Sequence, residues 1–234
     1  MNIVLQKYIA DAGYCSRRDA EELIREGKVK LNGQVAELGA RAGANDQVIV
    51  AGKILKPAND KVYIILNKPI DYVCTNRFFK EEKNIFELLD ARERLFVVGR
   101  LDKNSRGLVL LTNDGELTEK LSHPRYGHEK EYEVTVKNQE LGIKNLEFQF
   151  KKGVDIGEGD GIVRAKRVEM IGKNKFRVIL TEGKKRQIRR MFRVLGLTVT
   201  DLVRVRIGVI KLGDLKLGEW RHLTGKEVAA MKNE

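Results

Sequence analysis

The order of apolar and polar residues at the start of the chain predicts two short helices. Residues 3–13 have the pattern of one helix. Ser16 is typical of an N-cap for a second helix, and Asp19, three residues later, is a short-armed version of the capping box partner. Apolar residues then repeat at helical spacing until Gly27, which suits the left-handed stop after a helix.

Short strands follow these two helices. The alternating residues 29–31, the turn pair Asn32-Gly33 and Val35 predict a tight hairpin. Val48 and Val50 predict a further strand before Gly52. Two helices and a few short strands within about 55 residues therefore predict a compact front module.

The rest of the chain shows strands without regular helical crossovers. Residues 57–60 are expected to form a hinge, so we expect domains at 1–59 and 60–234. We expect an α+β fold, with a small α/β module followed by a domain built on a mixed, mainly antiparallel sheet flanked by helices. The strands are expected at residues 62–66, 95–98, 108–111 and 129–136, with short helices near 86–89 and 116–121.

Residues 184–193 predict an amphipathic helix that Gly196 ends. Apolar residues recur at helical spacing on one face of this helix, and arginines recur at the same spacing on the adjacent face. Four arginines on one stripe repel each other, so the stripe needs a counter-charge, either RNA phosphates or an active-site carboxylate. The alternative is a solvated basic face. The arginines are Arg186, Arg189, Arg190 and Arg193.

The charge balance changes the picture, because 45 Lys and Arg residues against 33 Asp and Glu residues give a formal charge of +12. Residues 1–60 hold 9 basic and 8 acidic side chains, whereas residues 184–221 hold 11 and 3. The excess is thus concentrated in one C-terminal stretch. This concentration favours a polyanionic partner, either nucleic acid or an acidic membrane surface.

Other features exclude several classes of protein. The apolar runs are far shorter than the roughly 20 residues of a membrane span, and the start lacks a signal-peptide pattern. Cys15 and Cys74 lie far apart, which is typical of buried thiols in a reducing cytoplasm. The glycines at 157, 159 and 161 lack the context of a nucleotide-binding loop, and Glu158 and Asp160 would repel phosphate, so we interpret the segment as a turn.

Asp102 is the first candidate for chemistry. It follows a buried strand and lies among Arg100, Lys103 and Arg106, and arginine beside a carboxylate keeps it ionised. An ionised, partly desolvated carboxylate can act as a nucleophile. From composition alone, the alternative of an aspartate that caps its own turn is favoured.

The front module carries a recognisable set of residues along nearly its whole length. They are Leu5, Lys7, Ile9, Gly13, Ser16-Arg17-Arg18, Ala20, Ile24, Gly27, Val29 and Leu31-Asn32-Gly33. With these residues the module resembles the S4 RNA-binding domain. This resemblance favours phosphate binding by Arg17 and Arg18 at the start of the second helix over arginines that simply point to solvent, and Lys28 is expected to bind RNA with them.

Several motifs follow one another along the full chain. They are Leu66-Asn67-Lys68-Pro69, Gly99-Arg100-Leu101-Asp102, Ser105 with Gly107-Leu108 and Leu110-Leu111-Thr112-Asn113-Asp114-Gly115, Glu129-Lys130 with Tyr132, Glu182-Gly183 with Arg186-Gln187-Ile188-Arg189-Arg190-Met191-Phe192, and Gly218-Glu219-Trp220-Arg221 with Leu223-Thr224. With these motifs in this order, the full chain resembles the RsuA-like family of ribosomal RNA pseudouridine synthases.

The resemblance implies roles for particular residues. Asp102 matches the aspartate that attacks the target uridine, at ribose C1′ or at the uracil ring, before the base rotates and rejoins through carbon. Tyr132 matches the tyrosine that packs on the base, although by pattern alone it is a core residue. Arg189 matches the arginine that pairs with the aspartate, with Arg186 and Arg190 close by. Arg100 matches a residue associated with base flipping.

The resemblance also implies the partners. We expect binding to a ribosomal RNA stem-loop by Arg100, Lys103, Arg186, Arg190 and Arg193 together with the front module, in a cytoplasmic monomer without metal or cofactor. The large-subunit RNA is favoured and the small-subunit RNA is the alternative. The rival functions are a non-catalytic RNA-binding protein and a methyltransferase, but the latter needs a glycine-rich cofactor loop that the sequence lacks.

Overall fold

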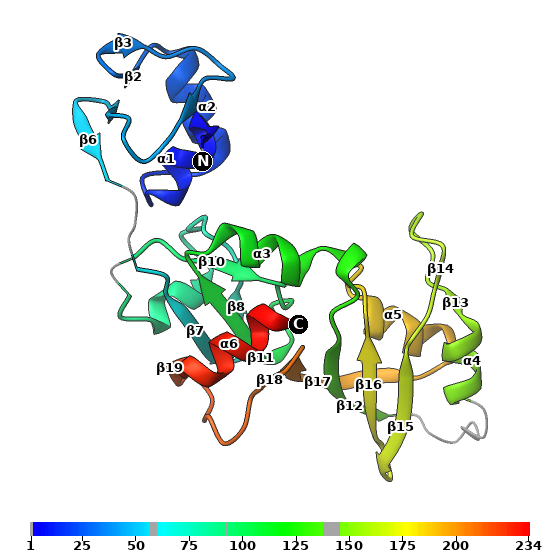
Figure 1. Ribbon diagram of the computed structural model, residues 1–234. Coiled ribbons are helices and arrows are strands. Elements are labelled where there is room, and N and C mark those ends of the chain that lie inside the picture. Colours follow the sequence, from blue (N-terminus) through cyan, green and yellow to red (C-terminus); the bar gives the residue numbers. More distant parts are fainter. Residues whose placement is uncertain (1, 57–59, 92, 138–145) are drawn as a thin grey trace. The chain divides into compact units, whose positions relative to one another are not determined.

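A computed structural model of the chain describes residues 2–56, 60–91, 93–137 and 146–234. The chain forms two compact units (Figure 1). The first comprises residues 1–62, 91–96 and 112–115, and the second comprises residues 63–90, 97–111 and 116–234. Residues 57–59 of the expected hinge at 57–60 lie outside the described residues, so the division at 59/60 stays a prediction.

The first unit begins with strand β1 (Ile3–Val4) and helices α1 (Leu5–Asp11) and α2 (Arg17–Arg25). The capping box at Ser16 is confirmed, because Asp19 N–H donates to Ser16 Oγ at 3.1 Å and Ser16 N–H donates back to the Asp19 carboxylate at 3.3 Å. Gly27 has φ +69°, as expected for the residue that ends this helix.

The hairpin of the first unit is also confirmed. Strands β2 (Val29–Leu31) and β3 (Gln34–Val35) meet at Asn32 and Gly33, which both have positive φ. Strands β5 (Val48–Val50) and β6 (Lys53–Leu55) extend this sheet in the order β3-β2-β5-β6, while β4 (Arg41–Ala42) pairs with β1. The core lies between the helices and the sheet and includes Leu5, Ile9, Ala20, Ile24, Val29, Val48 and Val50.

The second unit is built on a large sheet of the order β15-β16-β12-β17-β11-β7-β19, with β10 beside β11 and β18 beside β17. The pair β11–β17 is parallel, whereas β15–β16, β16–β12, β12–β17, β17–β18 and β7–β19 are antiparallel. The predicted mixed, mainly antiparallel sheet is therefore confirmed. Its strands are β7 (Tyr63–Lys68), β10 (Phe96–Val98), β11 (Arg106–Thr112), β12 (Lys130–Lys137), β15 (Arg167–Gly172), β16 (Lys175–Leu180), β17 (Thr198–Ile207), β18 (Ile210–Lys211) and β19 (Trp220–His222).

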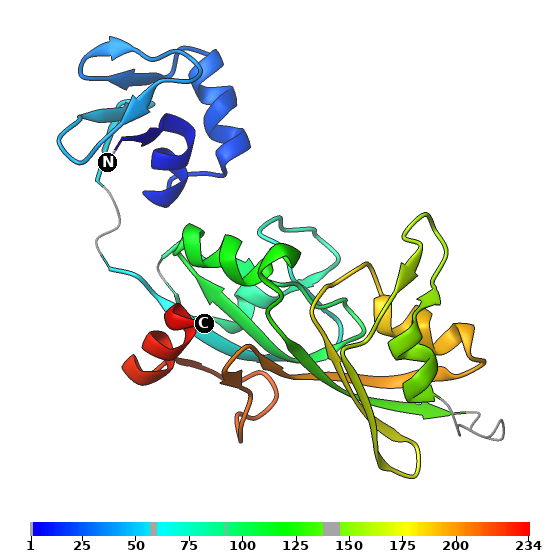
Figure 2. The same ribbon diagram turned by 45° about the vertical axis from the view of Figure 1, so that its right-hand side comes forward.

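Helices cover this sheet at two places (Figure 2). Helices α3 (Gly115–Ser122) and α6 (Gly225–Asn233) contribute Leu117, Leu121 and Met231 to a core with β7, β11 and β17. Helices α4 (Leu146–Lys152) and α5 (Gln187–Val194) pack together through Phe150 and Phe192, whose ring centroids are 5.1 Å apart. The remaining elements are β8 (Tyr72–Val73), β9 (Lys83–Asn84), the 3₁₀ turns η1 (Ile85–Leu88) and η2 (Pro124–Tyr126), and the hairpin β13 (Val154–Asp155) and β14 (Ile162–Val163).

The parallel pairing of β11 with β17 depends on a glycine. Gly107 lies opposite Arg204 and has φ +104°, a conformation that favours glycine. A Cβ atom at Gly107 would collide with the backbone oxygen and nitrogen of Arg204. Because Gly107 has no side chain, β11 and β17 can approach each other directly after the loop that carries Asp102.

Candidate active site

The Asp102 loop, residues 99–105, joins β10 to β11 and is held in place through its backbone. Ser105 N–H donates to the Asp102 carbonyl at 3.0 Å, which closes a turn. Lys68, at the end of β7, is fully buried, and its Nζ donates to the carbonyls of Ser105 at 2.7 Å, Lys103 at 3.2 Å and Pro69 at 2.9 Å. Burial lowers the pKa of Lys68 to about 8. These contacts fix the backbone directly after Asp102, and a rigid position suits a nucleophile.

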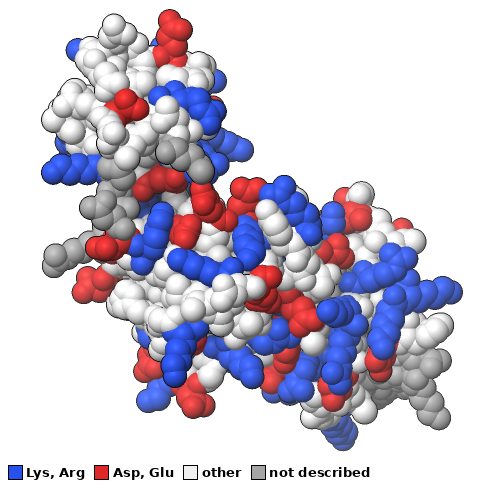
Figure 3. Space-filling view, in the orientation of Figure 1, with Lys and Arg blue, Asp and Glu red and all other residues white. Residues whose placement is uncertain are grey.

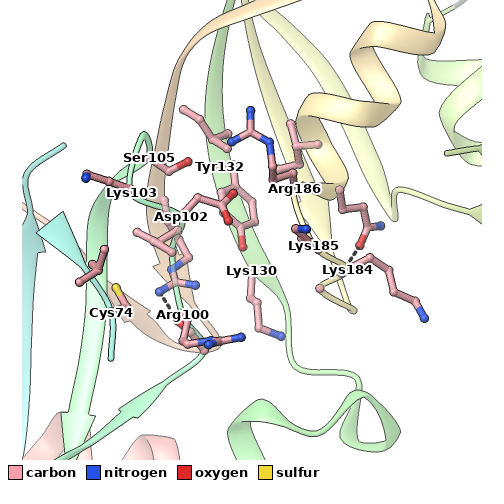
Figure 4. A pocket seen from close by; sticks show the side chains of 18 of the residues that line it. Cys74, Arg100, Asp102, Lys103, Ser105, Lys130, Tyr132, Lys184, Lys185 and Arg186 are labelled. Carbon is pink, nitrogen blue, oxygen red and sulfur yellow. Dashed lines mark hydrogen bonds between the residues drawn. The ribbon is translucent and has the colours of Figure 1, made fainter. Parts of the chain in front are cut away.

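A pocket of about 780 Å³ opens beside this loop. It lies between residues 99–105, strand β12 and the turn at residues 183–188 (Figure 4). Among the described residues that line it are seven cations and two carboxylates, Asp102 and Glu82, and Glu82 pairs with Lys103 at 3.3 Å. The exposed face in Figure 3 instead shows acidic and basic side chains interspersed. The pocket is therefore selectively cationic, as a site for a polyanion should be.

Tyr132 enters the pocket from β12. Residues 130, 132, 134 and 136 of this strand are buried and the residues between them are more exposed, so the predicted alternation is confirmed. Tyr132 is 8% exposed and also lines the pocket. In Figure 4 its ring lies beside the Asp102 carboxylate. Tyr132 is therefore both a buried residue of the sheet and a residue of the pocket wall, because the core of the sheet borders the pocket at this point.

The basic segment starts its helix later than predicted. Helix α5 begins at Gln187 and not at residue 184, and Arg186 precedes it with φ +51°. The buried Gln187 side chain accepts from Lys184 N–H at 2.8 Å and donates to Glu182 at 3.0 Å, so it organises a turn in place of the first helical turn. Arg186 consequently lines the pocket from this turn. Left-handed backbone at a non-glycine residue is a strain that often accompanies function.

Arg189 lies behind the Asp102 loop. Its guanidinium donates to the carbonyls of Asn104 at 2.6 Å and Val199 at 3.0 Å. Burial and then Arg186 lower the pKa of Arg189, and the charges of Asp102 and Asp201 oppose this shift. Within the described residues no ion pair joins Arg189 to Asp102, so the bidentate pair is not formed in this structure. Arg189 instead braces the loop two residues beyond Asp102.

Arg190 does not fit the expectation that it binds RNA. Its side chain is 5% exposed and points inward to the turn between β13 and β14. It donates to the Asp160 carboxylate at 2.6 Å and to the carbonyls of Ile156, Lys185 and Gly157. This turn is the one predicted from the glycines at 157, 159 and 161, and its Asp160 is the ion-pair partner of the buried Arg190. Arg193, in contrast, is exposed on α5.

The other predicted RNA-binding residues are distributed over both units. Arg100 and Lys103 line the pocket. Arg17 and Arg18 are exposed in the first turn of α2, and Lys28 is exposed and pairs with Glu26 at 2.8 Å. The structure thus places Asp102, Tyr132, Arg100, Lys103 and Arg186 around one pocket.

Three buried cations near the site had no predicted role. Lys68 follows an apolar strand and Lys130 precedes Tyr132 by two residues, so the strand alternation could have indicated that Lys130 shares the Tyr132 face. Arg204, which is 1% exposed, donates to the carbonyls of Leu108 at 2.7 Å and Gly99 at 2.6 Å. Its position in the middle of β17 gives no local signal, because those carbonyls are about a hundred residues away in the chain.

The chain matches the sequence profile described as RNA pseudouridylate synthase over residues 62–193 and that of the S4 domain over residues 5–48. The chain belongs to the RNA pseudouridylate synthase family. The combination of the two domains confirms the predicted resemblance to its RsuA-like members. It also confirms that the enzyme is an isomerase that forms pseudouridine in RNA.

The enzyme has curated relatives over nearly its whole length. It is 41% identical to the dual-specificity RNA pseudouridine synthase RluF of Salmonella typhi, over 96% of this chain and 76% of that protein. It is 38% identical to the ribosomal large subunit pseudouridine synthase B of Bacillus subtilis, over 97% and 95% of the two chains. A crystal structure of a pseudouridylate synthase aligns with a TM-score of 0.72 and 29% identity, over 98% of this chain and 99% of that chain. No helix among the described residues is long and apolar enough to cross a membrane.

Proposed function

We propose that this enzyme isomerises a uridine of large-subunit ribosomal RNA to pseudouridine, with Asp102 as the nucleophile. The observation that carries the proposal is the place of Asp102, a carboxylate on a braced loop in a pocket that seven cations line. The positive charge of the pocket attracts RNA. The name of the Bacillus subtilis relative supports the large subunit as the source of the substrate.

In the proposed reaction Asp102 forms a transient bond to the target nucleotide, at ribose C1′ or at the uracil ring. The glycosidic N1–C1′ bond breaks and the uracil turns. A C5–C1′ bond then forms, and the bond to Asp102 breaks, which restores the free carboxylate. The proton on C5 is lost and N1 gains one, so atoms and charge balance without a co-reactant. Tyr132 offers an aromatic face for the detached base. Arg100 lies at the pocket wall, where it can fill the place of an extruded base.

Arg189 supports Asp102 in this account. Its positive charge interacts with Asp102, and its guanidinium holds the Asn104 carbonyl. We propose that it pairs with the Asp102 carboxylate when RNA binds. Residues 1–59 are proposed to dock structured RNA through Arg17, Arg18 and Lys28.

The test is to map pseudouridine in the RNA of cells that lack the enzyme and are complemented with the wild type or with Asp102→Ala. We expect one large-subunit site to disappear and to return only with the wild type. Because one relative is named dual-specificity, the mapping covers all stable RNAs. A lost site confined to small-subunit RNA would refute the proposed substrate, and full rescue by Asp102→Ala would refute the proposed nucleophile.

A further inference from the structure

Lys130 is a largely buried cation on strand β12. It is 7% exposed and lines the pocket from the same face of β12 as Tyr132. Within the described residues its ammonium group has no hydrogen bond and no ion pair. Lys130 Nζ is not among the fully buried side-chain atoms that lack a hydrogen bond, so the ammonium group faces the open pocket. A cation that faces a pocket without a protein partner can bind an anionic ligand.

The carboxylates nearest to Lys130 in sequence cannot supply its counter-charge. Glu129 and Glu131 point to the opposite side of the sheet, where Arg206 donates to both at 2.8 Å. Lys166 also pairs with Glu129 at 2.7 Å, and Arg177 pairs with Glu131 at 3.1 Å. Both glutamates are therefore already neutralised.

Further cations lie close to Lys130. A Cβ atom built at Gly99 would lie 3.9 Å from Lys130 Cε and 3.6 Å from an Arg204 guanidinium nitrogen, so both side chains flank the same backbone position. Arg100 follows directly, and Figure 4 shows it extending to the same part of the pocket as Lys130. Burial, and then the charge of Arg204, lower the pKa of the Lys130 amine. Lys130, Arg204 and Arg100 thus concentrate positive charge at one part of the pocket wall, and in the described part of the chain no ion pair neutralises Lys130.

We propose that Lys130, together with Arg100, binds a backbone phosphate of the nucleotide that enters the pocket. A phosphate carries a full negative charge and several acceptor oxygens, whereas a uracil oxygen is neutral and cannot balance this cluster. The inference rests on the proposed RNA substrate and adds to it. The phosphate contact holds the sugar in place while the base is free to turn, which a C1′ reaction requires.

The first experiment measures RNA binding by Lys130→Met, which keeps the length of the side chain and removes its charge. With a large-subunit ribosomal RNA transcript, affinity is expected to fall about 10-fold, and the slope of log affinity against log salt to fall by about 0.7–1. Lys226→Met, which removes an exposed charge on α6, is the matched control and should leave both values unchanged. Lys130→Arg should restore most of the binding. An unchanged salt slope in Lys130→Met would overturn the inference.

A second measurement separates this role from a structural one. If Lys130 has no partner in the free protein, Lys130→Met should melt at the same temperature as the wild type or higher. A clear decrease in the melting temperature would mean that the amine stabilises the fold, and the inference would fail.

A third measurement is independent of which RNA is the substrate. Uridine monophosphate should protect Lys130 from acylation, as read by mass spectrometry, and uridine should not. Equal protection by both, or protection by neither, would contradict a phosphate site. If the wild type forms no pseudouridine in the transcript, the proposed substrate fails, whereas this measurement still decides the role of Lys130.

Discussion

The Lys68 ammonium group donates to the Ser105 carbonyl at 2.7 Å, so the end of β7 holds the loop that carries Asp102. We predict that Lys68→Met lowers kcat by at least 10-fold and leaves KM for RNA within about 3-fold, because a displacement of about 1 Å at the reacting group costs this much or more. Single-turnover kinetics with saturating RNA provides the measurement.

The control for this prediction is Lys216→Met, which removes an exposed lysine of the same unit. It should behave as the wild type. If Lys68→Met instead raises KM and keeps kcat, Lys68 contributes to RNA binding and does not position Asp102.

The lowered pKa of Lys68 predicts opposite effects of pH on stability and activity. Its pKa is about 8 in the folded protein and 10.5 for an unperturbed lysine, so the folded protein loses this proton at a lower pH than the unfolded chain does. This group therefore contributes more to stability as pH rises from about 8 to 10.5. Activity should fall over the same range, because the neutral amine has fewer donors for the three carbonyls that it holds.

This pH effect is checked by comparing kcat profiles of the wild type and Lys68→Arg, whose guanidinium does not titrate in this range. The decrease above pH 8 should be absent from the arginine variant. The same decrease in both enzymes would assign the titration to another group.

Arg190 and Arg193 lie on the same helix and should have different effects when replaced by alanine. Arg190→Ala leaves Asp160 and three carbonyls without their buried donor, and we expect a loss of about 2–4 kcal/mol in the free energy of unfolding. Arg193→Ala removes an exposed side chain and should cost less than about 0.5 kcal/mol. Urea unfolding followed by the fluorescence of Trp220, the single tryptophan, measures both. Equal effects would refute the structural role of Arg190.

Removal of residues 1–59 tests the proposal that this domain docks RNA while residues 60–234 carry the active site. We expect residues 60–234 to keep their fold by circular dichroism, while affinity for full-length ribosomal RNA falls by at least 10-fold because the S4 phosphate contacts are lost. A truncated protein that unfolds would contradict the domain boundary, and unchanged affinity would contradict the docking role.

Local signals in the sequence predicted much of this structure. The capping box at Ser16, the Asn32-Gly33 hairpin and the alternation through Tyr132 depend on residues a few positions apart, and each is confirmed. The features that the sequence does not predict depend on contacts between residues that are distant from each other in the chain. The inward direction of Arg190 requires the turn about 30 residues earlier, and the delayed start of α5 requires Gln187 to bond with Glu182. Neither helical periodicity nor charge counting contains this information.

The central claim is that Asp102 performs the chemistry, and the most direct measurement is tritium release from RNA that carries [5-³H]uridine, because forming the C5–C1′ bond removes the hydrogen on C5. We predict that Asp102→Asn releases no tritium above background, at least about 10⁴-fold below the wild type, while its RNA affinity stays within a few-fold. The exposed Asp214→Asn should match the wild type. Tritium release by Asp102→Asn at a rate near that of Asp214→Asn would contradict the account.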